Sequence, residues 1–166
     1  MKNTRIKILP FKRKRQNKTD YRLRLRLLTS QKPRLVIRKS LAAVRGQLIA
    51  YEAKGDRVLA TAESKELKGY GWEGAVRNTP SAYLTGYLLG LKAKKKNIKE
   101  AIIDIGLYRA TKGNILFALA KGVIDAGISI PLSDTILPKE ERLKGKHLKQ
   151  NQFDKVFQAL KLKVKE

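Results

Sequence analysis

The stretch RLVIRKSLAAVRGQLIAYEAKGDRVLAT, residues 34–61, decides the fold of this chain. It contains three short runs rich in aliphatic and β-branched residues, at 34–38, 47–51 and 57–61. Runs of this kind, bounded by polar residues, are typical of strands. The segment KGD at 54–56 supplies a turn between the last two runs. The sequence therefore predicts an antiparallel meander of three strands.

Downstream of the meander, helical and strand patterns alternate. A short helix is expected at 64–67, and a long helix begins at Thr79-Pro80, with Thr79 as the N-cap and Pro80 at the first helical position. Small residues at helical spacing follow along this helix, and we expect them to let its backbone lie close to the sheet. They are Ala82, Gly86, Gly90 and Ala93.

The remaining segments complete the predicted architecture. AIIDI at 101–105 reads as a buried strand, a helix follows from about Asn114 to Gly127, and residues 128–130 return as a strand. The segment from residue 138 is basic and helical. The sequence thus predicts an α/β fold of the α+β type, with a mixed sheet made of the meander and a βαβ-type half, helices packed on the sheet and a basic N-terminal extension.

The positive charge is concentrated at the start of the chain. Residues 1–39 carry 15 Lys or Arg and one acid, Asp20, which is +14 of the total net charge of +24. Folding gains nothing from such repulsion, and only an external polyanion can neutralise it, so nucleic acid is the first candidate partner. Residues 1–18 hold eight basic residues and no acid. We interpret them as an arm that becomes ordered on its partner.

Residues 21–28, YRLRLRLL, fit two interpretations. Their strict alternation favours a strand. Leu and Arg are good helix formers, however, and Thr19-Asp20 offers a helix cap.

Composition excludes several classes of protein. With 166 residues, 42% of them hydrophobic, the chain makes one domain with a real core. The absence of cysteine excludes disulfides, zinc knuckles, thiolate catalysis and iron–sulfur clusters. No apolar run approaches the roughly 18 residues that a membrane span needs.

Asp104 is the residue that most suggests catalysis, because a carboxylate on a central strand begins the metal site of some nucleases. Two-metal chemistry needs several convergent carboxylates, and the other candidates are Glu100 and Asp125. Asp125 follows Lys121 by four residues, which favours an exposed ion pair. We therefore expect Asp104 to be structural, bonded to loop backbone or paired with Arg109 or a lysine. His147, the only histidine, is expected at the surface.

Two further features have alternative interpretations. The loop GYGWEG at 69–74 displays Tyr70 and Trp72, which either stack on bases or cover the edge of the core. The lysines at 92 and 94–96 are either a solvated helix end or a phosphate-binding edge.

A series of short motifs follows in order along the chain. They are PFKRKR at 10–15, KTDYR at 18–22, KPRLVIR at 32–38, YGW at 70–72, NTPSAYLTG at 78–86, AIIDIGL at 101–107, KGVIDAG at 121–127, PKEER at 138–142 and GKH at 145–147. Together they resemble the archaeal L-eighteen family of large-subunit ribosomal proteins, whose eukaryotic counterpart is called L-five and which binds 5S rRNA. Residues after 147 are not matched.

The resemblance implies a structural constituent of the large ribosomal subunit, cytoplasmic and not an enzyme, that binds 5S rRNA and helps attach it to the large rRNA. Neighbouring large-subunit proteins are its other implied partners, with no cofactor, metal, membrane or small-molecule substrate. It places residues 21–28 in a helix. We expect a basic RNA-binding arm at 1–18, a globular 5S rRNA-binding domain at 19–147 and a basic helical tail at 148–166.

Carried over by position, the resemblance implies a set of RNA contacts in the N-terminal part, at the start of the sheet and in one loop. They are Phe11, Lys12, Arg13, Lys14, Arg15, Lys18, Thr19, Tyr21, Arg22, Arg24 and Arg26, then Arg34, Arg38, Lys39 and Ser40, and lastly Arg109. The chain departs from the family pattern at Leu41, Ala42 and Ala43, where polar, basic or aromatic side chains are usual. It departs again at Lys146, which replaces an acid.

Without the resemblance, the charge distribution and the helix and strand patterns indicate a basic RNA-binding α/β domain and leave two competing classes. A DNA-compacting protein presents the same charge, and binding of 5S rRNA against excess duplex DNA discriminates it. A metal-dependent nuclease built around Asp104 is discriminated by hydrolysis with added Mg²⁺ or Mn²⁺.

Overall fold

The computed structural model describes residues 9–148 and 153–162. The first eight residues of the predicted arm and parts of the predicted tail lie outside the described residues. In chain order the elements are α1 (Lys12–Arg15), α2 (Tyr21–Thr29), β1 (Arg34–Lys39), β2 (Val44–Ala50), β3 (Arg57–Glu63), η1 (Ser64–Tyr70), α3 (Thr79–Lys94), β4 (Ile102–Asp104), α4 (Ile115–Asp125), η2 (Asp134–Ile136), α5 (Glu140–Leu143) and α6 (Phe153–Leu162).

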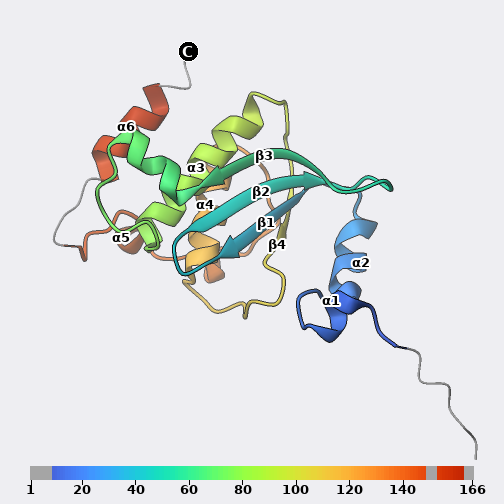
Figure 1. The fold of residues 1–166 in the computed structure, drawn as a ribbon. Coiled ribbons are helices and arrows are strands. Elements are labelled where there is room, and N and C mark those ends of the chain that lie inside the picture. Colours follow the sequence, from blue (N-terminus) through green and yellow to red (C-terminus); the bar gives the residue numbers. More distant parts are fainter. Residues whose placement is uncertain (1–8, 149–152, 163–166) are drawn as a thin grey trace, which may run out of the picture.

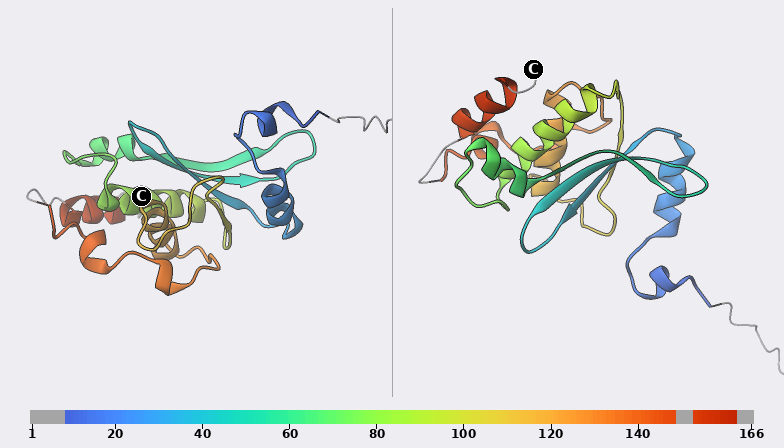
Figure 2. Two further views of the ribbon diagram at one scale, coloured as in Figure 1. Left: turned by 90° about the horizontal axis from the view of Figure 1, so that it is seen from below. Right: turned by 45° about the horizontal axis from the view of Figure 1, so that its top comes forward.

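The strands form one sheet in the order β3-β2-β1-β4. β1 pairs antiparallel with β2, and β2 pairs antiparallel with β3, which confirms the predicted meander (Figure 1). β4 lies parallel to β1, so the sheet is mixed. The helices α3 and α4 form a second layer against one face of the sheet (Figure 2). This is the predicted α+β arrangement.

The strand predicted at 128–130 is wrong. Among the described residues this segment contributes only a single parallel bridge, between Glu100 and Ser129. Pro131 follows and has no N–H to donate to a ladder. The predicted βαβ-type half is thus reduced to β4, α4 and one bridging residue.

Helix caps explain where the helices begin. The Asp20 carboxylate accepts hydrogen bonds from the N–H groups of Arg22 and Leu23, at 2.9 and 3.1 Å, and so starts α2 as a helix despite the alternating pattern. At α3 the cap is Asn78 and not the predicted Thr79. The Asn78 side-chain oxygen accepts from the N–H of Ser81 at 2.8 Å, and the Ser81 hydroxyl accepts from the N–H of Asn78 at 3.2 Å.

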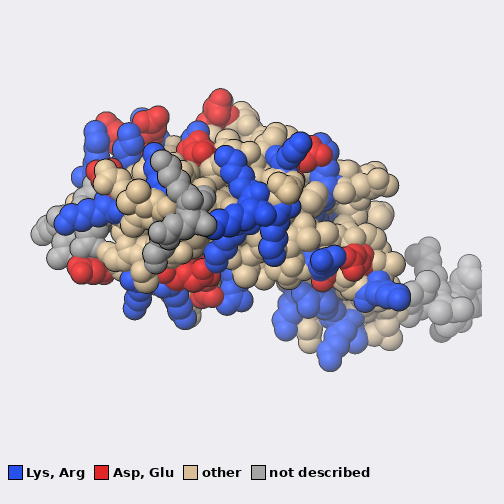
Figure 3. All heavy atoms as spheres, turned by 90° about the horizontal axis from the view of Figure 1, so that it is seen from above, with Lys and Arg blue, Asp and Glu red and all other residues tan. Residues whose placement is uncertain are grey.

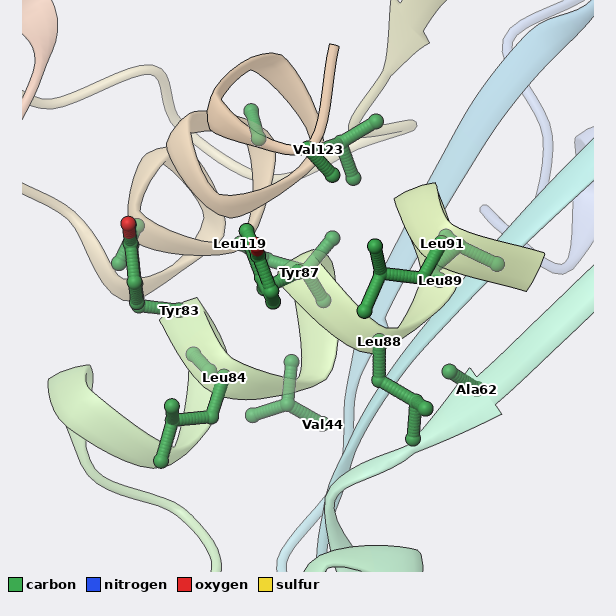
Figure 4. Packing of buried hydrophobic residues seen from close by; sticks show 14 of the residues in the cluster. Val44, Ala62, Tyr83, Leu84, Tyr87, Leu88, Leu89, Leu91, Leu119 and Val123 are labelled. Atoms are coloured by element: carbon green, nitrogen blue, oxygen red, sulfur yellow. The ribbon is translucent and has the colours of Figure 1, made fainter. Parts of the chain in front are cut away.

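The core lies between the sheet and the two long helices. Leu35, Ile37 and Leu48 of the sheet are fully buried against leucines of α3 and α4. Figure 4 shows Leu84 and Leu88 of α3 on the side of the helix that faces Val44 and Ala62 of the strands. Full burial of a Leu or Ile stabilises a fold by about 1.5–3 kcal/mol, so this interface is the main source of stability.

The two glycines of the stripe on α3, Gly86 and Gly90, contact α4, whereas the stripe was predicted to lie against the sheet. A Cβ atom added to Gly86 would lie 2.0 Å from the Leu119 carbonyl oxygen, and one added to Gly122 would lie 2.1 Å from the Tyr83 carbonyl oxygen. The two helix backbones therefore touch where glycines from both helices meet. The sequence pattern did identify a close approach, but it gave no indication of the partner.

The helical segment predicted from residue 138 is divided between α5, a single turn, and α6. On α6 the side chains of Phe153, Val156 and Leu160 are buried. The Phe157 ring lies 4.8 Å from the ring of Tyr87 on α3. This helix therefore packs on the helical layer (Figure 1). No helix within the described ranges is long and apolar enough to cross a membrane.

Candidate nucleic-acid interface

Most cations predicted to contact RNA lie outside the core. Residues 9–18 are exposed, and α2 buries none of its residues. In Figure 1, α1 and α2 stand beside one end of the sheet, away from α3 and α4, and in Figure 3 blue side chains crowd this region. The exposed cations here are Lys12, Arg13, Lys14, Arg15, Lys18, Arg22 and Arg26. Since they face solvent, they can meet phosphates without disturbing the fold.

The described part of the predicted arm folds back onto the start of α2. The ring of Phe11, 71% exposed, lies 5.2 Å from the ring of Tyr21. The Arg13 guanidinium donates to the Thr19 hydroxyl at 2.9 Å, and the N–H of Lys18 donates to the Arg13 carbonyl at 2.9 Å. These contacts give α1 a defined position relative to α2.

An ion-pair network attaches α2 to the sheet. We call it the Arg34 network; its members are Arg24, Arg34, Arg38, Asp56 and Asp104. Arg24 on α2 donates to both Asp56 oxygens at 2.9 Å. Arg34 donates to Asp56 at 2.7 Å and to Asp104 at 2.7 Å, and Arg38 reaches Asp104 at 3.2 Å. The network therefore joins α2, β1, the β2–β3 turn and the end of β4.

Arg34 differs from the other predicted RNA contacts because it is buried. Its side chain is only 4% exposed, and its two terminal nitrogens are occupied by Asp56 and Asp104. As the domain stands, Arg34 is an internal cation and not a surface contact. Its Nε is the buried side-chain nitrogen that has no hydrogen-bond partner among the described residues. A buried charge is tolerated when opposite charges surround it, and two carboxylates do so here.

A cleft of about 130 Å³ lies between α2 and the sheet. It brings together Arg13, Lys18 and Arg24 from the N-terminal part with Arg38 from β1. Asp20 and Asp104 also line it. The cleft is therefore a small polar space with an excess of positive charge, which suits a phosphate oxygen or an ordered water.

The other predicted contacts occupy separate positions. The Lys39 ammonium lies 5.9 Å from the centre of the Tyr108 ring, and the Tyr108 hydroxyl donates to the Lys39 carbonyl at 2.6 Å. The Ser40 hydroxyl accepts from the N–H of Ala43 at 3.0 Å and so closes the β1–β2 turn. Arg109 is exposed in the loop after β4.

Arg45 is a surface cation that the sequence reasoning missed. It is 55% exposed and pairs with Glu63 at 2.7 Å. It lines a second small cleft together with Lys39 and Ser40. Its position in β2, one residue after the strand starts, gave no signal, because the strand was expected to begin only at residue 47.

Asp104 is structural, as expected, although its cationic partners differ from the predicted ones. Its Oδ1 accepts from the N–H of Gly106 at 2.9 Å, which confirms the bond to loop backbone. The cations are Arg34 and Arg38 of the neighbouring strand, and not Arg109 or a lysine. Within the described ranges, no group of three or more His, Cys, Asp or Glu could hold a metal.

The structure places Trp72 and two of the four lysines from the features with alternative interpretations. Trp72 is 2% exposed and its indole N–H donates to the Ala75 carbonyl at 3.2 Å, so it covers the edge of the core. The Lys92 ammonium donates to the Thr61 carbonyl at 2.9 Å and pairs with Glu66 at 2.6 Å. Lys96 donates to the Leu59 carbonyl. These two lysines fasten the end of α3 to β3.

Comparison with known proteins agrees with the motifs. Residues 5–100 and 91–133 match the family described as "Ribosomal large subunit proteins 60S L5, and 50S L18". The chain is also 57% identical, over 141 residues, to the large ribosomal subunit protein uL18 of the archaeon Methanococcus maripaludis. That alignment covers 85% of this chain and 73% of the relative. The chain therefore belongs to the family of large-subunit ribosomal proteins 60S L5 and 50S L18, whose members are structural components of the ribosome and not enzymes.

Proposed function

We propose that this protein binds 5S rRNA through α1, α2 and the start of β1, and helps attach that RNA to the large rRNA. Membership of the family makes it a cytoplasmic constituent of the large ribosomal subunit, with rRNA and other ribosomal proteins as partners. The observation that carries the specific proposal is the exposed set of cations on α1 and α2, because none of them contributes to the core.

Charge explains why RNA is the favoured ligand of this surface. Each Lys or Arg that neutralises a phosphate releases a condensed counterion, which drives binding and makes it dependent on salt. The exposed ring of Phe11 and the half-buried ring of Tyr21 beside it add flat apolar surfaces on which unpaired bases can stack. Double-stranded DNA offers phosphates but few unstacked bases, so the aromatic pair favours RNA.

The Arg34 network gives this surface a fixed geometry. α2 has no buried residue, so apolar burial alone holds it weakly to the domain. Its bidentate pair with Asp56 fastens it to the β2–β3 turn. We infer that Arg34, itself buried, positions Asp56 and Asp104, while Arg24 and Arg38 at the cleft meet the phosphate backbone. The remaining proposed contacts are the arm and α2 residues named above, with Lys39, Ser40 and Arg109.

Competition binding tests this function. Labelled 5S rRNA is titrated with the protein in the presence of excess random duplex DNA, at several salt concentrations. If six to ten phosphates are contacted, the affinity for 5S rRNA is expected to fall by about three to five decades between roughly 50 and 200 mM salt. Equal affinity for 5S rRNA and for the DNA would contradict the proposal and favour a general DNA-compacting protein.

A matched pair of charge reversals identifies the surface. Arg22→Glu on α2 and Lys155→Glu on α6 both change an exposed cation. Only Arg22→Glu is expected to weaken 5S rRNA binding substantially and to reduce the log–log salt slope by about 1. Equal effects of the two variants would show that binding reflects net charge and not this surface.

A further inference from the structure

A wide surface cavity, the α5 cleft, lies far from α1 and α2. It has a volume of about 830 Å³ and is formed by the loop at 112–113, by η2 and by α5 with the turn that follows. Its rim carries Lys112, Lys139, Arg142, Lys146 and His147, and Glu141 is its one acidic residue. Leu137 and Pro138 provide apolar surface. The proposed 5S rRNA contacts include none of these residues.

The cations of this cleft are unusually free to bind a ligand. Lys112, Lys139, Arg142 and Lys146 are all exposed, and none of the four forms an ion pair with a described residue. The neighbouring Lys144 does pair, with Glu140 at 3.5 Å, but neither of these lines the cleft. The cleft therefore presents four permanent positive charges against one carboxylate.

The frame that presents these charges is anchored in the fold. The buried Leu143 fixes α5 to the core, and Gly145, at φ +69°, turns the chain against Pro80 at the start of α3. On the other wall, the N–H of Gly113 donates to the Ile136 carbonyl at 2.9 Å, which ties the 112–113 loop to η2. The cations thus project from a defined scaffold and not from a free tail.

The cleft and the α1–α2 surface lie at opposite ends of the molecule. Figure 1 places α5 at the left end of the domain and α1 and α2 at the right, with the sheet between them, and the right panel of Figure 2 agrees. The two surfaces share no lining residue. A ligand bound at one end therefore leaves the other end accessible.

We propose that the α5 cleft is a second RNA-binding surface, which holds the phosphate backbone of an RNA segment other than the one bound by α1 and α2. Its cations come from two segments, the loop at 112–113 and residues 139–147, and surround a wide opening. That arrangement suits a run of phosphates better than a single small anion, on which the cations would have to converge. This inference rests on the proposed function, because it assigns to the α5 cleft the attachment to the large rRNA.

The test is a capture assay with the full-length protein. 5S rRNA is immobilised, saturated with protein and washed, and a labelled transcript of the large rRNA is then added. The variant is the triple charge reversal Lys139→Glu, Arg142→Glu and Lys146→Glu. The control is the triple reversal Lys68→Glu, Lys99→Glu and Lys155→Glu, whose positions are exposed and lie outside the cleft. Thermal melting of both variants checks that the fold is retained.

The α5-cleft variant is expected to bind 5S rRNA as the wild type does, yet to lose capture of the large rRNA by at least about tenfold. Measured directly in solution, its log–log salt slope for the large rRNA is expected to fall by about 2 to 3. The control variant is expected to retain both activities.

Three outcomes would overturn the inference. Unchanged capture of the large rRNA by the α5-cleft variant would show that another ligand, such as an acidic protein segment, uses the cleft. If this variant lost binding to both 5S rRNA and the large rRNA, the cleft would belong to the 5S rRNA site. If the control variant lost capture of the large rRNA to the same extent, the effect would reflect net charge and not the cleft. If the wild type itself failed to bind 5S rRNA, the proposed function would fail, while the solution measurement on the large rRNA would still test the cleft.

Discussion

Arg34 and Asp104 meet across 70 positions of the chain, with Nη1 of Arg34 2.7 Å from Oδ2 of Asp104. Both side chains are almost completely buried, at 4% and 8% exposure. Two charges removed from water must satisfy one another, because an unpaired charge in the interior is costly. The pair therefore fixes the parallel alignment of β1 with β4 and also anchors the network that holds α2.

Replacing Asp104 by Asn removes the charge while keeping the shape of the side chain. We expect the free energy of unfolding to fall by roughly 3 kcal/mol, near the lower end for a broken buried pair, because Arg34 keeps Asp56. Urea unfolding measures this loss. Binding of 5S rRNA is expected to change little, since the Asp104 carboxylate is buried.

Asp134→Asn is the matched control, because Asp134 is exposed and forms no described ion pair. Its effect on stability is expected to lie within about 0.5 kcal/mol. Similar losses in the two variants would contradict a structural role for Asp104. Divalent-dependent RNA cleavage by the wild type that disappeared in Asp104→Asn would revive the nuclease interpretation.

The close contact between the glycines of α3 and α4 predicts that a larger residue there destabilises the protein. A methyl group at position 122 would lie 2.1 Å from the Tyr83 carbonyl oxygen, and backbone cannot move aside as a side chain can. Gly122→Ala is therefore expected to destabilise the protein by about 3 kcal/mol or more, as overpacking between elements does. Gly69→Ala, where no atom lies within 4 Å of the added Cβ, is expected to be tolerated. Thermal or urea unfolding of the two variants compares them.

Deletion of residues 1–18 is expected to separate folding from binding. The described residues of this segment are all exposed, so the truncated protein is expected to melt cooperatively near the temperature of the full chain. If about five of the eight cations touch phosphate, the log–log salt slope for 5S rRNA falls by about four. Calorimetry and binding titrations measure the two effects. An unfolded truncation product would show that the arm is part of the core.

Tyr83 predicts a specific dependence of stability on alkaline pH. Burial first, and then the hydrogen bond of its hydroxyl to Asp125 at 2.9 Å, raise the pKa of Tyr83 above its ordinary value of 10.0. The folded state therefore favours the neutral phenol. Its stabilising contribution is complete below pH 10 and is lost as the pH rises through the raised pKa.

Comparison with Tyr83→Phe isolates this contribution, because both proteins share the other groups that titrate at high pH, including Tyr87. The wild type is expected to be more stable by a constant amount from about pH 7 to 9, and the difference is expected to shrink above about pH 10. Tyr51→Phe, at an exposed position, is expected to show no such trend. A difference between wild type and Tyr83→Phe that stayed constant to pH 11 would contradict the assignment.

Local signals in the sequence predicted most of the helices and strands. They did not predict which of these elements contact one another. The β-rich runs located the meander, whereas at α2 the local signals left strand and helix open, and only the family resemblance added to the Thr19-Asp20 cap favoured the helix. The stripe containing Gly86 indicated a close approach, but its partner Gly122 lies on another helix, and helical spacing alone cannot reveal which element fills the space.

The candidate site shows the same division. Exposed cations on α1 and α2 follow directly from the local density of positive charge in the sequence. The burial of Arg34 does not, because it depends on Asp56 and Asp104 arriving from distant strands through the parallel pairing of β1 with β4. An arginine within a basic run looks like a surface residue until its acidic neighbours in space are known.

The lysines that fasten α3 to β3 also affect how readily one copy of the protein can associate with another. β3 is an edge strand, and its free carbonyls could pair with the edge of another copy. Lys92 and Lys96 occupy the carbonyls of Thr61 and Leu59, and they place two positive charges along that edge. Strand-to-strand aggregation would have to displace both and to desolvate them. We therefore expect these two lysines to disfavour pairing of β3 with a second copy of the chain before RNA is bound.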